Sequence, residues 1–442
     1  MLFLQINLII TLNKQILKLA IPNIISNLTV PLLGIVDLAI LGHLESEVYI
    51  GAIALGGLIF NFVYWGFNFL RMGTTGMTAQ AFGKNNNQEI SHLFFRSIII
   101  ALAVGLALIL LQSPIEWFSF VIMDGSKEVE KLASGYFFIR IYAAPATIGL
   151  FALIGWFLGM QNARYPLIIA LVINILNVVL NYIFVFVFNM KSDGVALGTV
   201  IAQYSGFILG LILFLKKYKN FLNYGKSLKT IFNVKDMKKF FDINKNIIIR
   251  TVLLIFAFSF FTNQSAKISD TMLAVNTILF QFFLVFSYFI DGFAFAAESL
   301  VGKYYGAKDK IKLKEIISKL FIWGLFISLP FTVLYLILGG NFLYILTNNK
   351  DVITMTSPYL FWIALIPLLS FSAFLWDGIY TGVTATKAMR NSMIIAVLLI
   401  YLPATYLFMH LFGNHGMWLA LMLFMVSRGL LLTILAKRNV YL

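Results

Sequence analysis

Residues 79–84 have the sequence AQAFGK, and residues 297–303 have the sequence AESLVGK. Each segment closes a long apolar stretch and leads into a short polar loop. Three further pairs follow in the same order, Pro145 with Pro367, Gly159 with Gly382 and Gly194 with Gly416. A common order at nearly one offset indicates an internal repeat with a period of about 220 residues.

The apolar stretches within each repeat are typical of membrane spans. Of the 442 residues, 60% are hydrophobic and 12% are charged, about half the charged share of an ordinary soluble domain. A bilayer-spanning helix needs about 20 mostly apolar residues. The sequence predicts twelve such spans, at residues 15–41, 50–73, 93–112, 133–160, 165–188, 194–215, 248–268, 274–301, 315–339, 355–382, 391–411 and 415–436.

These spans divide evenly between the repeats. Because six is an even number, both halves cross the membrane in the same direction, which makes the repeat a parallel one. The expected fold is an all-α integral membrane protein with an N-lobe at 1–220, a basic linker at 221–247 and a C-lobe at 248–442. Two such lobes can enclose a cavity that opens alternately to either side.

The basic residues predict the orientation. Twenty-five of the 33 lysines and arginines fall in loops or span ends on the side that holds both termini, five fall on the other side, and Arg140, Arg250 and Arg428 are assigned to span interiors. Cytoplasmic loops collect Lys and Arg, so we expect both termini to be cytoplasmic. The nine lysines of the segment 216–247 account for much of the net charge of +15 and suit anionic lipid headgroups better than nucleic acid.

Several functional classes find no support in the sequence. The chain has no cysteine, and its four histidines show no ligand spacing, so we expect no metal or haem cofactor. The glycine-containing segment GTTGMTAQAFGK at 73–84 lacks the Gly-Lys-Ser/Thr ending of a nucleotide-binding loop. No catalytic cluster indicates an enzyme, so an ion gradient is the expected source of energy.

Asp37 is the most informative polar residue. It lies in the segment IVDLAILG of the first span, downstream of Pro22 and Pro31, either of which can kink a helix. Ionisable groups inside spans are costly and are functional candidates. Asp37 is therefore a candidate ion-binding or titrating carboxylate, and a headgroup-level aspartate is the structural alternative.

The fifth and sixth spans carry further polar residues at helical spacing. Asn174, Asn177 and Asn181 occupy one face of the fifth span. This face should point away from lipid, where it could line a cavity or bond to neighbouring helices. Thr199 and Gln203 form a second pair in the sixth span.

Charged residues also fall within the spans of the second half. Arg250 and Asp377 are expected to pair, because buried charges need partners. Asp291 is a further candidate for a polar or substrate site in this lobe, whereas Glu298 is expected at an interface near the cytoplasmic end. Arg140 of the fourth span could pair with Asp37 or with a helix-end carbonyl.

Four segments carry a resemblance to a known family, namely AIPNIISNLTVPLLGIVDLAILGHL at 20–44, NILNVVLNYIFVF with GVALGTVIAQ at 174–203, IDGFAFAAESLVGKYYGAKD at 290–309 and WDGIYTGVTATKAMRNSM at 376–393. Together they resemble the multidrug and toxic compound extrusion (MATE) family, and the last two are similar to its DinF-like branch. The resemblance implies two six-helix lobes in a V around a central cavity. It also implies cation-coupled efflux of amphipathic, often cationic compounds.

The resemblance assigns site residues as well. It implies that Asp37 is the coupling carboxylate and that Asn177, Asn181 and Thr199 belong to the same cation site. Many relatives have aspartate where this chain has Asn181, which leaves Asp37 as the one acid of the site. One acid can carry one proton, so H⁺ is the favoured coupling ion. Na⁺ held by Asp37, Asn177 and Asn181 is the alternative.

A flippase, a channel and a membrane enzyme are the alternative functions. A flippase for lipid-linked saccharides would need more cationic residues in the cavity than the three arginines within spans. A channel needs no two-lobe repeat, and a membrane enzyme would need a catalytic cluster. We therefore expect an exporter of small molecules, acting as a monomer in the inner membrane of a bacterium.

Overall fold

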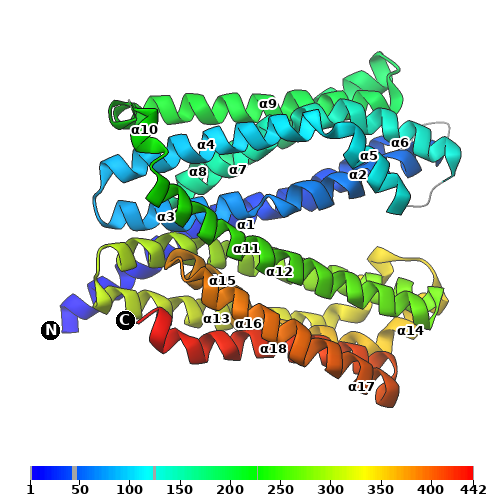
Figure 1. Cartoon of the computed structure of the whole chain (residues 1–442). Helices are drawn as coiled ribbons and strands as arrows, with labels where there is room; N and C mark the ends of the chain where they lie inside the picture. The colour runs from blue at the N-terminus through cyan, green and yellow to red at the C-terminus, as the bar shows by residue number, and fades with distance from the viewer. Residues whose placement is uncertain (1, 42–46, 123–125, 226, 442) are drawn as a thin grey trace. The chain divides into compact units, whose positions relative to one another are not determined.

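The computed structural model of the chain describes residues 2–41, 47–122, 126–225 and 227–441, with the side chains of residues 2–10, 30, 32–41, 47, 50 and 228 outside the description. Within these ranges all the regular structure is helical. Figure 1 follows the helices in chain order. The α-helices are α1 (Leu2–Leu41), α2 (Glu47–Gly66), α3 (Phe69–Gly83), α4 (Asn87–Leu110), α5 (Gln112–Ile122), α6 (Lys127–Arg140), α7 (Ala144–Gly159), α8 (Arg164–Tyr182), α9 (Lys191–Tyr218), α10 (Leu228–Ile231), α11 (Val234–Ile268), α12 (Asp270–Gly306), α13 (Lys310–Leu346), α14 (Lys350–Thr356), α15 (Leu360–Gly382), α16 (Thr386–Ile394), α17 (Leu402–Phe412) and α18 (Asn414–Asn439).

The helices match the predicted spans. Among the described residues, eleven helical stretches between Gly51 and Asn439 are long and apolar enough to cross a membrane, and they overlap predicted spans two to twelve. The predicted first span lies within α1. The N-terminal end of α1 and the C-terminal end of α18 lie at the same end of one compact unit (Figure 1), as an even number of spans requires.

The chain forms two compact units. Unit 1 contains Met1–Ile24 and Lys239–Leu442, and unit 2 contains Ile25–Lys238. Both boundaries fall inside helices, one in α1 and the other in α11. The sequence repeat predicts that the whole first helix belongs to the N-lobe. The predicted lobe boundaries describe the two sequence repeats, and they stay a prediction.

Corresponding helices of the two repeats pack in the same way. In unit 2, α7 packs against α3 and α4, and α8 packs against α9. In unit 1, α15 packs against α12 and α13, and α17 packs against α18. The repeat found in the sequence therefore also governs which helices contact one another.

Glycines at matching positions allow these contacts. A Cβ atom at Gly155 of α7 would meet the backbone of Arg71 in α3, and one at Gly378 of α15 would meet the backbone of Ala294 in α12. The paired glycines Gly159 and Gly382 face the same two helices one turn later. Small residues at helix contacts in membranes let backbones approach closely, which explains why the repeat retains them.

The linker differs from the expected loop. Residues 219–224 form a short 3₁₀-helix, α10 follows, and α11 begins at Val234 rather than near residue 248. Arg96 of α4, which is 1% exposed, donates two hydrogen bonds to the carbonyl of Ile231, at 3.0 and 2.6 Å. Ser91 donates to the carbonyl of Phe221 at 2.7 Å. The many lysines of the linker suggested a solvent-exposed loop. The structure shows that carbonyl groups within this segment accept hydrogen bonds from α4.

Candidate functional site

The backbone of α1 carries Asp37 in an uninterrupted helix that runs through both Pro22 and Pro31. The side chain of Asp37 lies outside the described residues. Its role as the coupling carboxylate therefore stays a prediction. The boundary between the two units follows Ile24, close to Pro22, whose ring removes one backbone hydrogen bond from α1.

The polar face of α8 points into unit 2, as expected. Asn177 is 2% exposed and Asn181 is fully buried, one helical turn apart. Asn181 donates through Nδ2 to Oδ1 of Asn177 at 2.9 Å. Asn177 in turn donates through Nδ2 to Oγ1 of Thr199 on α9, also at 2.9 Å, and Thr199 donates to the carbonyl of Val195.

These bonds form one directional chain from α8 to α9. Asn177 and Thr199 each both accept and donate in it, so the orientation of one side chain fixes the orientation of the next. The structure thus brings together three of the four residues that were expected to share a cation site. The chain also engages the oxygens of Asn177 and Thr199, which would otherwise be available as ligands for a hard cation.

A close helix contact holds the end of this chain in place. A Cβ atom at Gly198 of α9 would collide with Oδ1 of Asn181. No larger residue fits there unless the Asn181 amide moves, and in a buried site it has little room to do so.

We therefore expect Gly198→Ala to reduce ion-coupled efflux strongly, by about tenfold or more, since small displacements of positioned groups can cost as much. Efflux of a fluorescent substrate from proteoliposomes measures this loss. Gly57→Ala is the matched control, because a Cβ atom at Gly57 would have no described atom within 4 Å. Equal efflux by the two variants would show that the position of the Asn181 amide is unimportant.

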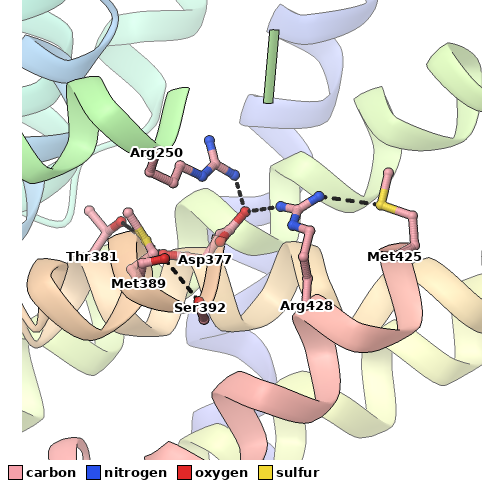
Figure 2. Close-up of polar contacts among 7 residues, drawn as sticks. All are labelled: Arg250, Asp377, Thr381, Met389, Ser392, Met425 and Arg428. Carbon is pink, nitrogen blue, oxygen red and sulfur yellow. Dashed lines mark hydrogen bonds and ion pairs between the residues drawn. The ribbon is translucent and has the colours of Figure 1, made fainter. Parts of the chain in front are cut away.

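Unit 1 contains a second buried polar cluster, shown in Figure 2. Asp377 of α15 accepts hydrogen bonds through Oδ2 from Arg250 of α11 and from Arg428 of α18. The Arg428 bond measures 2.5 Å. The three residues are 6%, 9% and 2% exposed, respectively. The expected ion pair between Arg250 and Asp377 is therefore present in the structure.

Arg428 is the partner that sequence reasoning missed. It lies 51 positions from Asp377 in the chain, and its guanidinium also contacts Sδ of Met425 at 3.3 Å. An arginine inside the last span was the available signal, but nothing in its spacing pointed to α15. Asp291 of α12 interacts electrostatically with Arg428, so it belongs to the same region.

The formal charges of the residues in this second cluster cancel. Arg250 and Arg428 contribute two positive charges, and Asp377 and Asp291 contribute two negative charges. Because both guanidinium groups bind one oxygen of Asp377, that carboxylate already has internal cations as partners. Its other oxygen, Oδ1, is buried and has no hydrogen-bond partner among the residues that the structure describes. This geometry favours a fixed polar centre over an exchange site for a mobile cation.

A metal cofactor has no ready site in the described part of the chain. There, no group of three or more histidine, cysteine, aspartate or glutamate side chains is placed to hold a metal ion. The polar groups that the structure does bring together are mainly amides, hydroxyls and arginines, which suit hydrogen bonding to organic groups better than the tight binding of a resident metal.

Comparisons with known proteins agree with this architecture. The model of the family described as MatE matches residues 22–183 and again residues 247–407, one match in each repeat. The DNA damage-inducible protein F of Escherichia coli (strain K12) is 36% identical over 427 residues, which cover 97% of this chain and 92% of that protein. A probable multidrug resistance protein NorM of Thermotoga maritima is 23% identical, with 95% and 91% covered.

Solved structures show the same fold. The Vibrio cholerae MATE transporter VcmN in its bent form has a TM-score of 0.87 to this chain at 17% identity, with 98% of each chain covered. A MOP superfamily transporter from Pyrococcus furiosus also has a TM-score of 0.87 at 17% identity, with 97% of this chain and 96% of that chain covered. These matches confirm the expected class of all-α membrane fold, with two parallel six-helix repeats.

Proposed function

This chain belongs to the MatE family of multidrug and toxin extrusion transporters, and we propose that it exports amphipathic or cationic organic compounds in exchange for protons. It is a multi-pass membrane transporter and not an enzyme. The proposal concerns the substrate, the ion and the residues that couple them. Alternating access of the cavity to the two sides of the membrane would link outward substrate movement to inward ion movement.

The observation that carries the proposal is the hydrogen-bonded chain of Asn181, Asn177 and Thr199 in unit 2. These are the residues that the family resemblance associates with the coupling aspartate. An amide at position 181 leaves Asp37 as the one acid of the proposed site. A single buried carboxylate can take up and release one proton when its environment changes between the two states.

Sodium is the weaker candidate for the coupling ion on physical grounds. A hard cation needs several oxygen ligands, and carboxylates supply the strongest of them. The oxygens of Asn177 and Thr199 each accept or donate a hydrogen bond within the chain already. Na⁺ would have to share these oxygens with the hydrogen bonds that they already accept, whereas proton coupling needs only the one acid.

We assign the cluster of Arg250, Asp377 and Asp291, together with Arg428, to the stability of unit 1. The location proposed for the whole protein is the inner membrane of a bacterium, with both termini in the cytoplasm and a monomer as the working unit. The orientation rests on the distribution of lysine and arginine.

A susceptibility assay tests the proposed function. The gene is expressed in a bacterial strain that lacks its own exporters of this type, and the growth-inhibiting concentrations of cationic dyes and drugs are measured. Higher tolerance, with no change in the pool of lipid-linked saccharides, supports export. Unchanged tolerance combined with an altered saccharide pool would instead identify a lipid-linked saccharide flippase.

A further inference from the structure

The fourth predicted span is broken in the middle of unit 2. Helix α6 ends at Arg140, a 3₁₀ turn occupies residues 141–143, and α7 starts at Ala144 with Pro145 in its first turn. The counterpart in unit 1 also contains a 3₁₀ turn, at Ser357–Tyr359, but α15 then continues through Pro367. The break in unit 2 is confined to its 3₁₀ turn, since Lys127–Gly159 is otherwise one continuous helical stretch.

Arg140 lies at this break and is the charged group nearest to it in sequence. Its Nη1 donates to the hydroxyl of Tyr136 at 2.5 Å. Its guanidinium carbon lies 4.8 Å from the ring centre of Phe60 and 5.4 Å from that of Tyr136. Among the described residues, no acid forms an ion pair with Arg140, and its Nε atom is buried without an acceptor. The acid of the neighbouring α9, Asp193, instead packs near Gly135.

Two hydroxyl groups near Arg140 also lack a normal hydrogen bond. Tyr64 of α2 lies next to Thr147 of α7 and within electrostatic reach of Arg140. Both hydroxyl oxygens are buried, and neither has a hydrogen bond of normal geometry in the described part of the chain. Thr147 is only 9% exposed. The two hydroxyls lie close enough to interact with each other, but together with Nε of Arg140 they form a group of buried polar atoms without a normal hydrogen bond among the described residues.

We propose that Tyr64, Arg140 and Thr147 form a binding site for a carboxylate group of the transported compound. The inference rests on the proposed export function and narrows its substrate class to amphipathic compounds that carry a carboxylate. A carboxylate accepts several hydrogen bonds and neutralises a guanidinium, so it meets the needs of all three donors. The rings of Phe60 and Tyr136 provide the apolar wall that the body of such a compound would contact.

This arrangement discriminates against compounds without the acid. An ester or amide analogue would bring no counter-charge to the half-buried Arg140 guanidinium, which has no ion pair with an acid among the described side chains, and binding sites reject analogues that leave their polar groups unpaired. A single buried water could satisfy hydrogen bonds but not the positive charge. The site should therefore prefer a zwitterion to the cation made by esterifying its carboxylate.

A pair of fluorescent probes tests this preference directly. Tetramethylrhodamine carries a free carboxylate, and its methyl ester is otherwise identical. Fluorescence anisotropy gives the dissociation constant of each probe with the full-length protein purified in detergent. We expect the wild type to bind the free acid about tenfold more tightly than the ester, the range set by a hydrogen bond to a charged group.

Variants then locate the source of the preference. Arg140→Gln should weaken binding of the acid by about tenfold without weakening binding of the cationic ester, from which it removes a like charge, whereas Arg140→Lys should retain part of the preference. Arg164→Gln is the matched control, since Arg164 is an exposed arginine of the same unit. Thermal unfolding and size exclusion establish that each variant is folded. Thr147→Val and Tyr64→Phe carry the same test if Arg140→Gln does not fold.

Three results would overturn the inference. The wild type could fail to bind the free acid, bind the two probes equally, or lose both equally in Arg140→Gln. Gradient-driven efflux of the methyl ester tests the export function separately. Efflux of the ester without any preference for the acid would sink the carboxylate site alone, whereas absence of gradient-driven efflux of either probe would sink the proposed function.

Discussion

Replacement of Asp377 by asparagine is expected to lower the free energy of unfolding by about 3–5 kcal/mol, the usual cost of breaking a buried ion pair by removing one partner. The carboxylate is 6% exposed and receives hydrogen bonds from both Arg250 and Arg428. Asparagine retains one acceptor oxygen but removes the negative charge. Two buried guanidinium groups would then face each other with Asp291 as the remaining acid of the region.

Thermal unfolding in detergent, followed by intrinsic fluorescence, measures this loss. Asp351→Asn is the matched control, because Asp351 is an exposed aspartate of the same unit and has no ion pair in the described residues. The double variant Asp377→Asn with Arg250→Gln removes one charge of each sign, so it should recover part of the lost stability. If Asp377→Asn unfolds like the control, the cluster is not what stabilises unit 1.

Replacement of Asp37 by asparagine is expected to abolish drug tolerance in cells while the protein is still inserted in the membrane. The reason is that asparagine cannot bind and release a proton, so substrate export would lose its link to the proton gradient. Asp37→Glu keeps the acid and should retain part of the activity. Tolerance is measured in an exporter-deficient strain at equal protein levels.

Asp351→Asn serves as the control for Asp37→Asn. Asp351→Asn should leave tolerance unchanged, since that residue lies outside the proposed site in an exposed helix start. Full tolerance with Asp37→Asn would mean that Asp37 is a structural aspartate near the membrane surface. The coupling site would then have to be sought elsewhere in the chain.

The membrane fold could be predicted from the sequence because the bilayer imposes a length on each span. Every predicted span overlaps a helix. The glycines Gly159 and Gly382, which the sequence repeat pairs, make the same helix contact in both units. The two matches of the MatE family model confirm the repeat independently. Periodicity also sufficed for Asn177 and Asn181, because two residues four positions apart on one helix must share a face.

Contacts between distant helices could not be predicted in the same way. Arg428 approaches Asp377 through the packing of α18 against α15, and no local pattern encodes that contact. The anchoring of the linker by Arg96 was hidden by the surrounding lysines, which suggested a loop. The 3₁₀ break beside Arg140 was equally invisible, since Pro145 and Pro367 occupy matching places in the sequence but only Pro145 lies in the first turn after a 3₁₀ segment.

Efflux from proteoliposomes can distinguish proton coupling through Asp37 from sodium coupling. Wild type and Asp37→Asn are reconstituted, loaded with a fluorescent cation, and given either a pH gradient or a sodium gradient of equal size. We expect that the pH gradient alone drives efflux by the wild type, and that the efflux rate of the variant equals that of protein-free liposomes. Efflux driven by sodium alone, or normal proton-driven efflux by Asp37→Asn, would contradict it.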